Sequence, residues 1–330
     1  MQIILNEYGQ YLGVKGQSFA VYQKKKLIQQ VPFYKTDSVV LKNGNNVSTS
    51  ALFWLATYGI DTVIMSPSGK PLSLLLPLSS DKRVKTRMKQ QEVYFNHKGV
   101  EIAKAIVKAK VENQALMLEE YGFSTKRFRF NFERLKGKSV EEVRARLTGA
   151  EGSCSGRFFR RYIKLFPKCL RPSIREKYRA VQPMNNVLNL AYEILKGEVY
   201  KSVVNAHLDP YLGFLHSLEF GKPSLVCDMQ ELFRIVVEHF LLGYVTTLDP
   251  KDSFEKRGKR FFLTTKEEAR LIREINRLLS SQIKHTRITT TFGKKCQIRT
   301  AIKEESVKLG QYIRGEKSTY TPLIVFPKIS

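Results

Sequence analysis

The chain is 330 residues long, 42% hydrophobic and 11% aromatic, which is enough to fill one large core or two ordinary ones and excludes general disorder. Lys and Arg number 56 against 30 Asp and Glu, so the formal net charge is +26 and the pI is near 9.9. A folded protein this basic repels itself unless it usually meets a polyanion, and nucleic acid is the commonest polyanion partner.

The first 75 residues are predicted to form mostly β-strands. Residues 2–33 alternate apolar and polar side chains and are rich in Val, Ile and aromatics, with Gly, Asn and Lys at hairpin-like intervals. Residues 47–59 are predicted to form a short helix. Residues 61–78 follow as two strands joined by the Ser-Gly-Lys turn at 68–70. Such a pattern is typical of a small β-sandwich.

From about Asp81 the spacing of apolar residues changes to three and four, which is the period of helices. Residues 81–122 are long enough for two long helices. Further helices are predicted at 139–148, 151–165, 185–202, 228–243, 265–284 and 298–313. The predicted fold is α+β: a β-sandwich-like N-terminal domain over residues 1–80, followed by a larger all-α domain over residues 81–330.

Most of the positive charge lies in the predicted helical part. Residues 1–80 hold seven Lys, no Arg and three acids, a balance of +4. The other 250 residues hold 49 basic and 27 acidic side chains, a balance of +22. The surface that meets a polyanion is therefore expected mainly in the second part. A ribosome-like or membrane-surface binder, in which charge alone acts, is the alternative.

Two basic clusters are candidate tracks for a nucleic acid. One is a run interleaved with aromatic rings: Arg157, Phe158, Phe159, Arg160, Arg161, Tyr162, Lys164, Phe166, Lys168, Arg171 and Arg175. Basic side chains can follow a phosphate backbone while bases stack on the rings. A solvated amphipathic helix whose rings are core fits the same pattern. The second cluster is Lys256, Arg257, Lys259 and Arg260, which also fits a solvated loop.

The four cysteines form no CxxC pair and show no spacing of zinc ligands, so they are expected to be reduced, as in a cytoplasmic protein. The N-terminus lacks the basic region and cleavage site of a signal peptide. Apolar stretches are too short for a membrane span, because charged residues interrupt them. We therefore expect a soluble protein without a membrane partner.

Two segments contain the residues that suit chemistry. Glu151 lies between small residues at the predicted start of the basic helix, and His216 precedes a Gly-Lys-Pro turn. Asp228 and Glu231 are predicted to open a helix three residues apart, on one face near its positive N-terminus. Oxygen ligands with one imidazole suit Mg²⁺ or Mn²⁺ better than structural zinc, and such an ion neutralises charge on a reacting phosphate.

Each of these residues also has a purely structural interpretation. Glu151 can stabilise a helix N-terminus, and His216 can be a hydrogen-bonded core histidine. Asp228 and Glu231 resemble a capping pair. Spacing alone does not choose between these interpretations and a metal site.

Four segments in a fixed order carry a family resemblance. They are LTGAEG with Glu151, NNVLNLAY over residues 185–192, LDPYLGFLH ending in His216, and GKPSLVCDMQELFR with Asp228 and Glu231. They resemble, in the same order, motifs of the Cas-one family of CRISPR-associated integrases, which act in spacer acquisition. NEYGQYLG near the N-terminus and the MKQQ segment preceded by Arg87 agree more weakly.

The resemblance implies roles for these residues. The implied catalytic metal ligands, for Mg²⁺ or Mn²⁺, are Glu151, His216 and Glu231. Asp228 is implied to orient a ligand or a water without touching the ion. The connection from His216 to the Gly-Lys-Pro turn is longer than in some relatives, and it leaves open whether Glu219 is a ligand.

Two more side chains near these ligands have candidate roles on DNA. Lys222 is placed to meet a phosphate, or is an ordinary turn lysine. Arg234 either holds Glu231 in place or touches DNA. Together with Arg157, Arg160, Arg161 and Lys259, they complete the predicted DNA-binding set.

The resemblance further implies an activity and partners. In the family, the metal site cuts double-stranded or branched DNA and joins a 3′-hydroxyl to a phosphodiester of a repeat array. The implied assembly is a homodimer through the β-rich domains, bridged by a small ferredoxin-like partner of the same adaptation system. Two rivals remain: a non-catalytic basic scaffold for nucleic acid, and a general repair nuclease for branched DNA.

Overall fold

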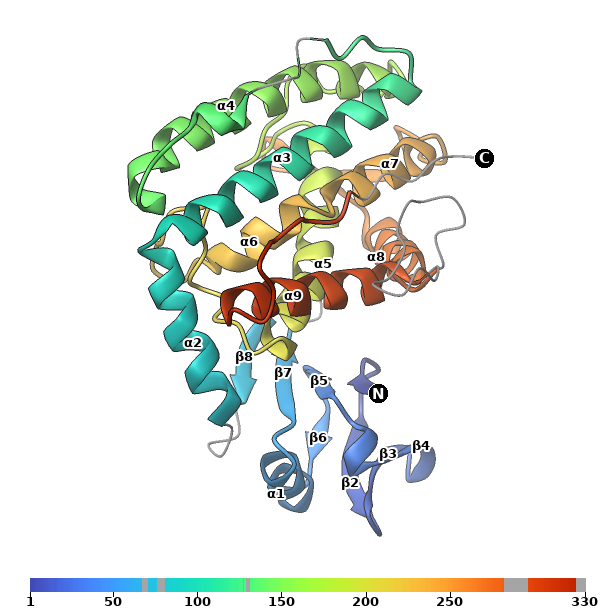
Figure 1. Ribbon diagram of the computed structural model, residues 1–330. Coiled ribbons are helices and arrows are strands. Elements are labelled where there is room, and N and C mark those ends of the chain that lie inside the picture. The colour runs from blue at the N-terminus through green and yellow to red at the C-terminus, as the bar shows by residue number, and fades with distance from the viewer. Residues whose placement is uncertain (67–70, 76–80, 127, 129–130, 282–295, 325–330) are drawn as a thin grey trace.

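The computed structural model describes residues 1–66, 71–75, 81–126, 128, 131–281 and 296–324 (Figure 1). Two four-stranded sheets make up most of the N-terminal part. The first has the order β1–β5–β7–β8, from Gln2–Leu5, Ser38–Lys42, Asp61–Met65 and Pro71–Leu75. In this sheet β1, β5 and β7 run parallel, and β8 pairs antiparallel with β7.

The second sheet has the order β4–β3–β2–β6, from Lys26–Pro32, Ser18–Gln23, Gln10–Lys15 and Asn46–Val47. Alternation along β3 turns Phe19 and Val21 inward, where they meet Leu12 of β2 and Ile3 of β1. Helix α1 (Thr49–Thr57) closes this core and is capped by Ser48, whose hydroxyl oxygen accepts the Ala51 N–H at 3.1 Å. The predicted turn at 68–70 lies outside the described residues.

The C-terminal part is helical. Its helices are α2 (Asp81–Tyr94), α3 (His97–Glu120), α4 (Val140–Tyr162), α5 (Pro183–Asn205), α6 (Ser224–Glu231), α7 (Arg234–Val245), α8 (Thr265–Ser280) and α9 (Ile298–Ile313). Short 3-10 turns lie at Phe33–Lys35, Phe132–Arg134 and Ile163–Leu165. Helix α5 is buried along most of its length and contacts α6, α7, α8 and α9. It is the central helix against which the others pack.

The α+β prediction is confirmed at this level: a strand-rich N-terminal region precedes a helical region (Figure 1). The sandwich form of the first region stays a prediction. The division into domains 1–80 and 81–330 also stays a prediction, supported by separate hydrophobic clusters in the two parts. Polar contacts join the parts: Asn205 Nδ2 donates to Ser38 Oγ at 3.4 Å, and Lys303 Nζ lies 3.2 Å from Asp37 Oδ2.

Three details of the prediction were wrong. The helices expected at 139–148 and 151–165 are one continuous helix, α4, and the helix expected at 228–243 is divided into α6 and α7. The second region is not all-α, because Phe254–Arg257 and Arg260–Leu263 pair as the antiparallel hairpin β9–β10. Gly258, with φ of +64°, makes the tight turn of this hairpin possible.

No helix in the described part of the chain is both long and apolar enough to span a membrane.

Candidate active site

A cleft of about 580 Å³ brings together the residues that the sequence singled out from three distant segments. Its walls come from α4, from α5 and from the chain between residues 211 and 234. The predicted residues that line it are Glu151, His216, Lys222, Glu231 and Arg234. The convergence of side chains 80 positions apart in the sequence is what a catalytic cleft requires.

Glu151 lies in the middle of α4, not at a helix start as predicted. Gly149, Gly152 and Gly156 all lie within this helix, although glycine costs a helix about 1 kcal/mol relative to alanine. Tertiary packing outweighs this cost, because α4 buries apolar side chains on both sides of Glu151, among them Leu147 and Phe158. Nothing lies within 4 Å of a Cβ placed at any of the three glycines, so the helix face that they share is open.

Asp228 and Glu231 do not open a helix either. Helix α6 begins at Ser224 and ends at Glu231, so Asp228 lies in its second turn and Glu231 at its last position. The expected capping role of Asp228 is therefore wrong. The side chain of Glu231 is only 3% exposed, and its carboxylate faces the cleft.

Asp228 is fully buried and does not line the cleft. One of its oxygens accepts the N–H groups of Phe214 and Leu215 at 2.5 and 2.9 Å. The other accepts the His216 N–H at 2.9 Å and lies 2.7 Å from His216 Nδ1. A side chain at Gly213 would lie 2.8 Å from this carboxylate, so glycine permits the approach.

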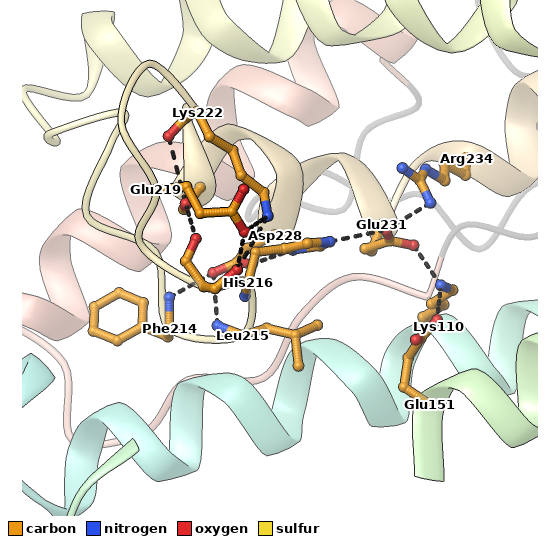
Figure 2. A network of polar contacts seen from close by, with 12 residues as sticks. Lys110, Glu151, Phe214, Leu215, His216, Glu219, Lys222, Asp228, Glu231 and Arg234 are labelled. Atoms are coloured by element: carbon orange, nitrogen blue, oxygen red, sulfur yellow. Dashed lines mark hydrogen bonds and ion pairs between the residues drawn. The ribbon is translucent and has the colours of Figure 1, made fainter. Parts of the chain in front are cut away.

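The consequence is a fixed imidazole. With Nδ1 held by Asp228, the Nε2 atom of His216 points toward Glu231 and lies 3.9 Å from its Oε1 (Figure 2). A carboxylate that bonds one ring nitrogen sets the tautomer and leaves the other nitrogen free for a ligand. This geometry supports the orienting role predicted for Asp228.

Lys110, which the sequence analysis did not single out, lies at the centre of the site. Its ammonium contacts Glu151 Oε1 and lies 2.6 Å from Glu231 Oε2 (Figure 2). The spacing of apolar residues along α3 could have revealed it, because Lys110 lies on the same buried helix face as Ile106, Val107 and Asn113. A lysine on an otherwise buried helix face needs a charged partner, and here it has two.

The charges of this cluster support one another. Burial by itself raises the pKa of Glu231, but Arg234 and Lys110 outweigh it and bring that pKa to about 2. Burial likewise opposes ionisation of Glu151, yet Lys110 holds its pKa below the usual value. Arg234 donates from 2.6 Å to Glu231 and lies over the Tyr192 ring at 4.8 Å. Both carboxylates are therefore anionic at neutral pH.

The donor set fits a divalent cation. Among the described residues, no three His, Cys, Asp or Glu side chains are grouped closely enough to hold a metal ion. The Glu151 and Glu231 carboxylates are instead both paired with Lys110. The ammonium shows that this position already holds a positive charge between Glu151 and Glu231. Two carboxylates and one imidazole are ligands suited to Mg²⁺ or Mn²⁺.

Glu219 and Lys222 lie at the mouth of the cleft. Lys222 Nζ donates to Glu219 Oε1 at 2.8 Å and to Ser217 Oγ at 3.2 Å. The Glu219 side chain is 59% exposed and is turned to this lysine, whose hydrogen bond lowers its pKa. Glu219 is thus the partner of a surface lysine, away from the carboxylate pair.

A second, larger cavity of about 1220 Å³ adjoins the cleft and is strongly basic. We call it the basic groove; its lining includes Arg157, Arg160, Arg161, Lys164, Lys168, Arg171, Arg175 and Lys177. Phe159, Arg175 and Lys177 line both cavities, so the two lie side by side. The Gly152 and Gly156 backbone also lines the groove, which lets a ligand approach α4 closely.

The aromatic rings of this segment divide into two kinds. Phe158, Tyr162 and Phe166 are buried in the helical core, as the structural interpretation expected, and only Phe159 reaches the cavities. Lys259 lies elsewhere, exposed at the turn of the β9–β10 hairpin and outside both cavities. The two predicted phosphate tracks are therefore separate surfaces.

Comparison with known proteins places this site in a family context. Residues 3–277 match the family model described as CRISPR associated protein Cas1. A CRISPR-associated endonuclease Cas1 of Korarchaeum cryptofilum is 27% identical over 244 residues, covering 67% of this chain and 71% of the relative. One from Thermus thermophilus is 28% identical over 330 residues, covering 96% of this chain and 94% of the relative.

Solved structures share the fold. A casposase bound to its integration product has a TM-score of 0.72 at 21% identity and covers 100% of this chain and 99% of its own. A chain of a partial Cas6-RT-Cas1–Cas2 complex has a TM-score of 0.70 at 17% identity, with coverage of 100% and 99%. At these identities the likeness is one of fold.

We predict that Lys110→Met destabilises the protein by about 3–5 kcal/mol, because it leaves two buried carboxylates facing each other without a cation. Mn²⁺ should raise the melting temperature of this variant more than that of the wild type, since the ion replaces the lost charge. Thermal melts with and without Mn²⁺ measure both effects. Lys108→Met, at an exposed position of the same helix, is the control. Equal Mn²⁺ shifts in variant and wild type would contradict the carboxylate pair as a cation site.

Proposed function

Because the chain belongs to the Cas1 family of CRISPR-associated proteins, we propose that it is a divalent-metal-dependent DNA endonuclease and integrase that inserts DNA segments as spacers into a repeat array. Glu151, His216 and Glu231 would hold the ion. The observation that carries the proposal is their convergence in one cleft that opens into the basic groove.

The ion, when bound, would neutralise charge on the reacting phosphate and on the leaving oxygen. The other roles belong to side chains that the fold holds in place around the proposed ion. Asp228 keeps the Nε2 atom of His216 turned to the cleft. Arg234 and the Tyr192 ring hold the Glu231 carboxylate against rotation. Lys222, at the cleft mouth, is placed to bind a phosphate of the incoming strand.

The basic groove supports DNA as the substrate. Arg157, Arg160 and Arg161 face it from the same helix that carries Glu151, so a strand bound along α4 leads to the carboxylate. Arginine side chains neutralise backbone phosphates without reading sequence. Such binding suits an enzyme that accepts DNA segments of unrelated sequence.

The proposed partners are a second copy of the chain and a small ferredoxin-like protein of the same adaptation system. The fold likeness to a chain in a complex named Cas1–Cas2 supports such an assembly. The strand-rich region is the proposed dimerisation surface. It exposes several large apolar side chains, including Tyr8, Tyr34 and Phe53.

We predict that Glu151→Ala abolishes DNA cleavage and strand transfer while leaving most DNA affinity. The variant loses a proposed metal ligand, whereas the phosphate contacts of the basic groove remain. The measurement is integration into a supercoiled repeat-array plasmid with Mg²⁺ or Mn²⁺, with and without the small partner, beside a DNA-binding titration. Glu219→Ala, which removes an acid turned away from the pair, is the matched control and should stay active.

Three outcomes of this experiment separate the rivals. Full turnover by Glu151→Ala would reject the site. DNA binding without any metal-dependent chemistry in the wild type would favour the non-catalytic scaffold. Cleavage of unrelated branched DNA, without integration at the array, would favour the general repair nuclease.

We predict that replacing Arg157, Arg160 and Arg161 together with Gln weakens DNA binding and flattens its salt dependence by roughly one unit of slope per lost phosphate contact. The affinity for Mn²⁺ should stay unchanged, because these side chains face the groove and not the carboxylate pair. Binding titrations over a range of salt concentrations measure the slope. Lys259→Gln tests the hairpin surface in the same way. An unchanged slope in the triple variant with a reduced one in Lys259→Gln would move the DNA track to the hairpin.

A further inference from the structure

A third cavity, of about 500 Å³, lies where the strand-rich region meets the helices; we call it the junction cavity. The β1–β5–β7 sheet forms one wall, and α5, α8 and the start of α9 form the others. Helix α5 separates it from the catalytic cleft. Tyr192 and Lys196 of α5 line the cleft, whereas Ile194, Gly197 and Lys201 line the junction cavity.

The lining of the junction cavity carries more positive than negative charge. Its basic side chains are Lys42, Lys201, Arg273, Arg277 and Arg299, against a single carboxylate, Glu198. One Glu198 oxygen is shared by Lys201 at 3.2 Å and Arg299 at 3.3 Å. Arg277 pairs instead with Glu274 at 3.0 Å. The local charge therefore stays positive.

Two of these cations have no partner within the described part of the chain. The side chains of Lys42 and Arg273 make no hydrogen bond or ion pair with another described residue, and that of Arg273 is exposed. Lys42 is half buried, and burial together with the nearby Lys201 ammonium lowers its pKa. The Lys42 ammonium thus lies in a partly desolvated cavity beside a second ammonium and has no carboxylate of its own, which is unfavourable unless an anion binds there.

Five apolar side chains complete the lining, and we call them the apolar wall. Ile4, Val40 and Met65 come from the sheet, and Ile194 and Ile272 come from the helices. Val40, Met65 and Ile4 belong to a small hydrophobic cluster of their own on this side of the sheet. A cavity of this size, with an apolar wall and a few convergent charged groups, is typical of a small-ligand site.

We propose that the junction cavity binds a nucleoside phosphate, with its phosphates between Lys42, Lys201 and Arg273 and its base against the apolar wall. The ligand is either a free nucleotide or the 5′-phosphorylated terminal nucleotide of a DNA strand. Both present the same chemistry, an anion of two or more charges attached to a flat, weakly polar ring. An inorganic anion would neutralise the cations but would leave the apolar wall exposed to water.

The site is distinct from the proposed catalytic centre, yet it shares α5 with it. A ligand there would connect β5, which carries Lys42, to α5, which carries Lys201, and to α8, which carries Arg273. It would thereby hold the strand-rich region against the central helix of the catalytic part.

Isothermal titration calorimetry of the full-length protein tests the proposal. The probes are ATP, inorganic pyrophosphate and a short single-stranded oligonucleotide with or without a 5′-phosphate. Lys42→Gln and Arg273→Gln should each weaken binding roughly tenfold or more, as expected for loss of a charge-assisted contact. Lys266→Gln, an exposed change of equal charge on α8, should have no such effect. Arg273 is exposed, so its replacement does not threaten the fold.

The different probes distinguish a free nucleotide from the end of a DNA strand, and they also show which results would overturn the proposal. Tight binding of ATP identifies a free nucleotide, and binding that depends on the 5′-phosphate of the oligonucleotide identifies a strand end. No saturable binding of either, or equal weakening by Lys266→Gln, would overturn the proposal. Pyrophosphate binding as tight as that of ATP would overturn the role of the apolar wall. None of these results depends on whether the catalytic cleft cuts DNA.

Discussion

The proposed catalytic cleft depends on one buried electrostatic arrangement: two carboxylates that share a cation. Glu151 and Glu231 come from helices far apart in the sequence. Their carboxylates would repel each other if the Lys110 ammonium did not lie between them. Removing charges from water costs several kcal/mol each, so the cluster persists only because every member is paired. Arg234 completes the balance at Glu231. This is the site at which we propose that a divalent ion binds.

The rest of the structure serves to place these groups. Helix α5 is the buried centre of the helical part, and its Tyr192 lies beneath the Arg234 guanidinium. Asp228 collects three backbone N–H groups and the imidazole of His216, and thereby fixes the chain that precedes α6. Gly152 and Gly156 line the basic groove, and the space beside them is open to a ligand that follows α4. Rigid elements therefore hold the donors, and an open groove leads to them.

The spacing of apolar residues predicted most of the helices and strands. It could not predict places where tertiary packing outweighs local helix propensity. The span 298–313 agrees with α9, because its apolar positions repeat at helical spacing between clear ends. Helix α4 continues through three glycines because the buried side chains on either side of them outweigh the local cost. Glu151, His216 and Glu231 line one cleft, and their role as metal ligands stays a prediction. Lys110 escaped notice because one lysine among many looks solvent-exposed until the helix face it shares is known to be buried.

The central claim is that the charge now supplied by Lys110 marks the place of a divalent ion. A crystal structure of the protein soaked in Mn²⁺, with anomalous data at the manganese edge, tests it most directly. The account predicts one strong anomalous peak within roughly 2.0–2.4 Å of the Glu151 and Glu231 carboxylates and of His216 Nε2, with the Lys110 ammonium moved away. A peak bound elsewhere, or a Lys110 ammonium still between the carboxylates in a crystal that binds Mn²⁺, would contradict it.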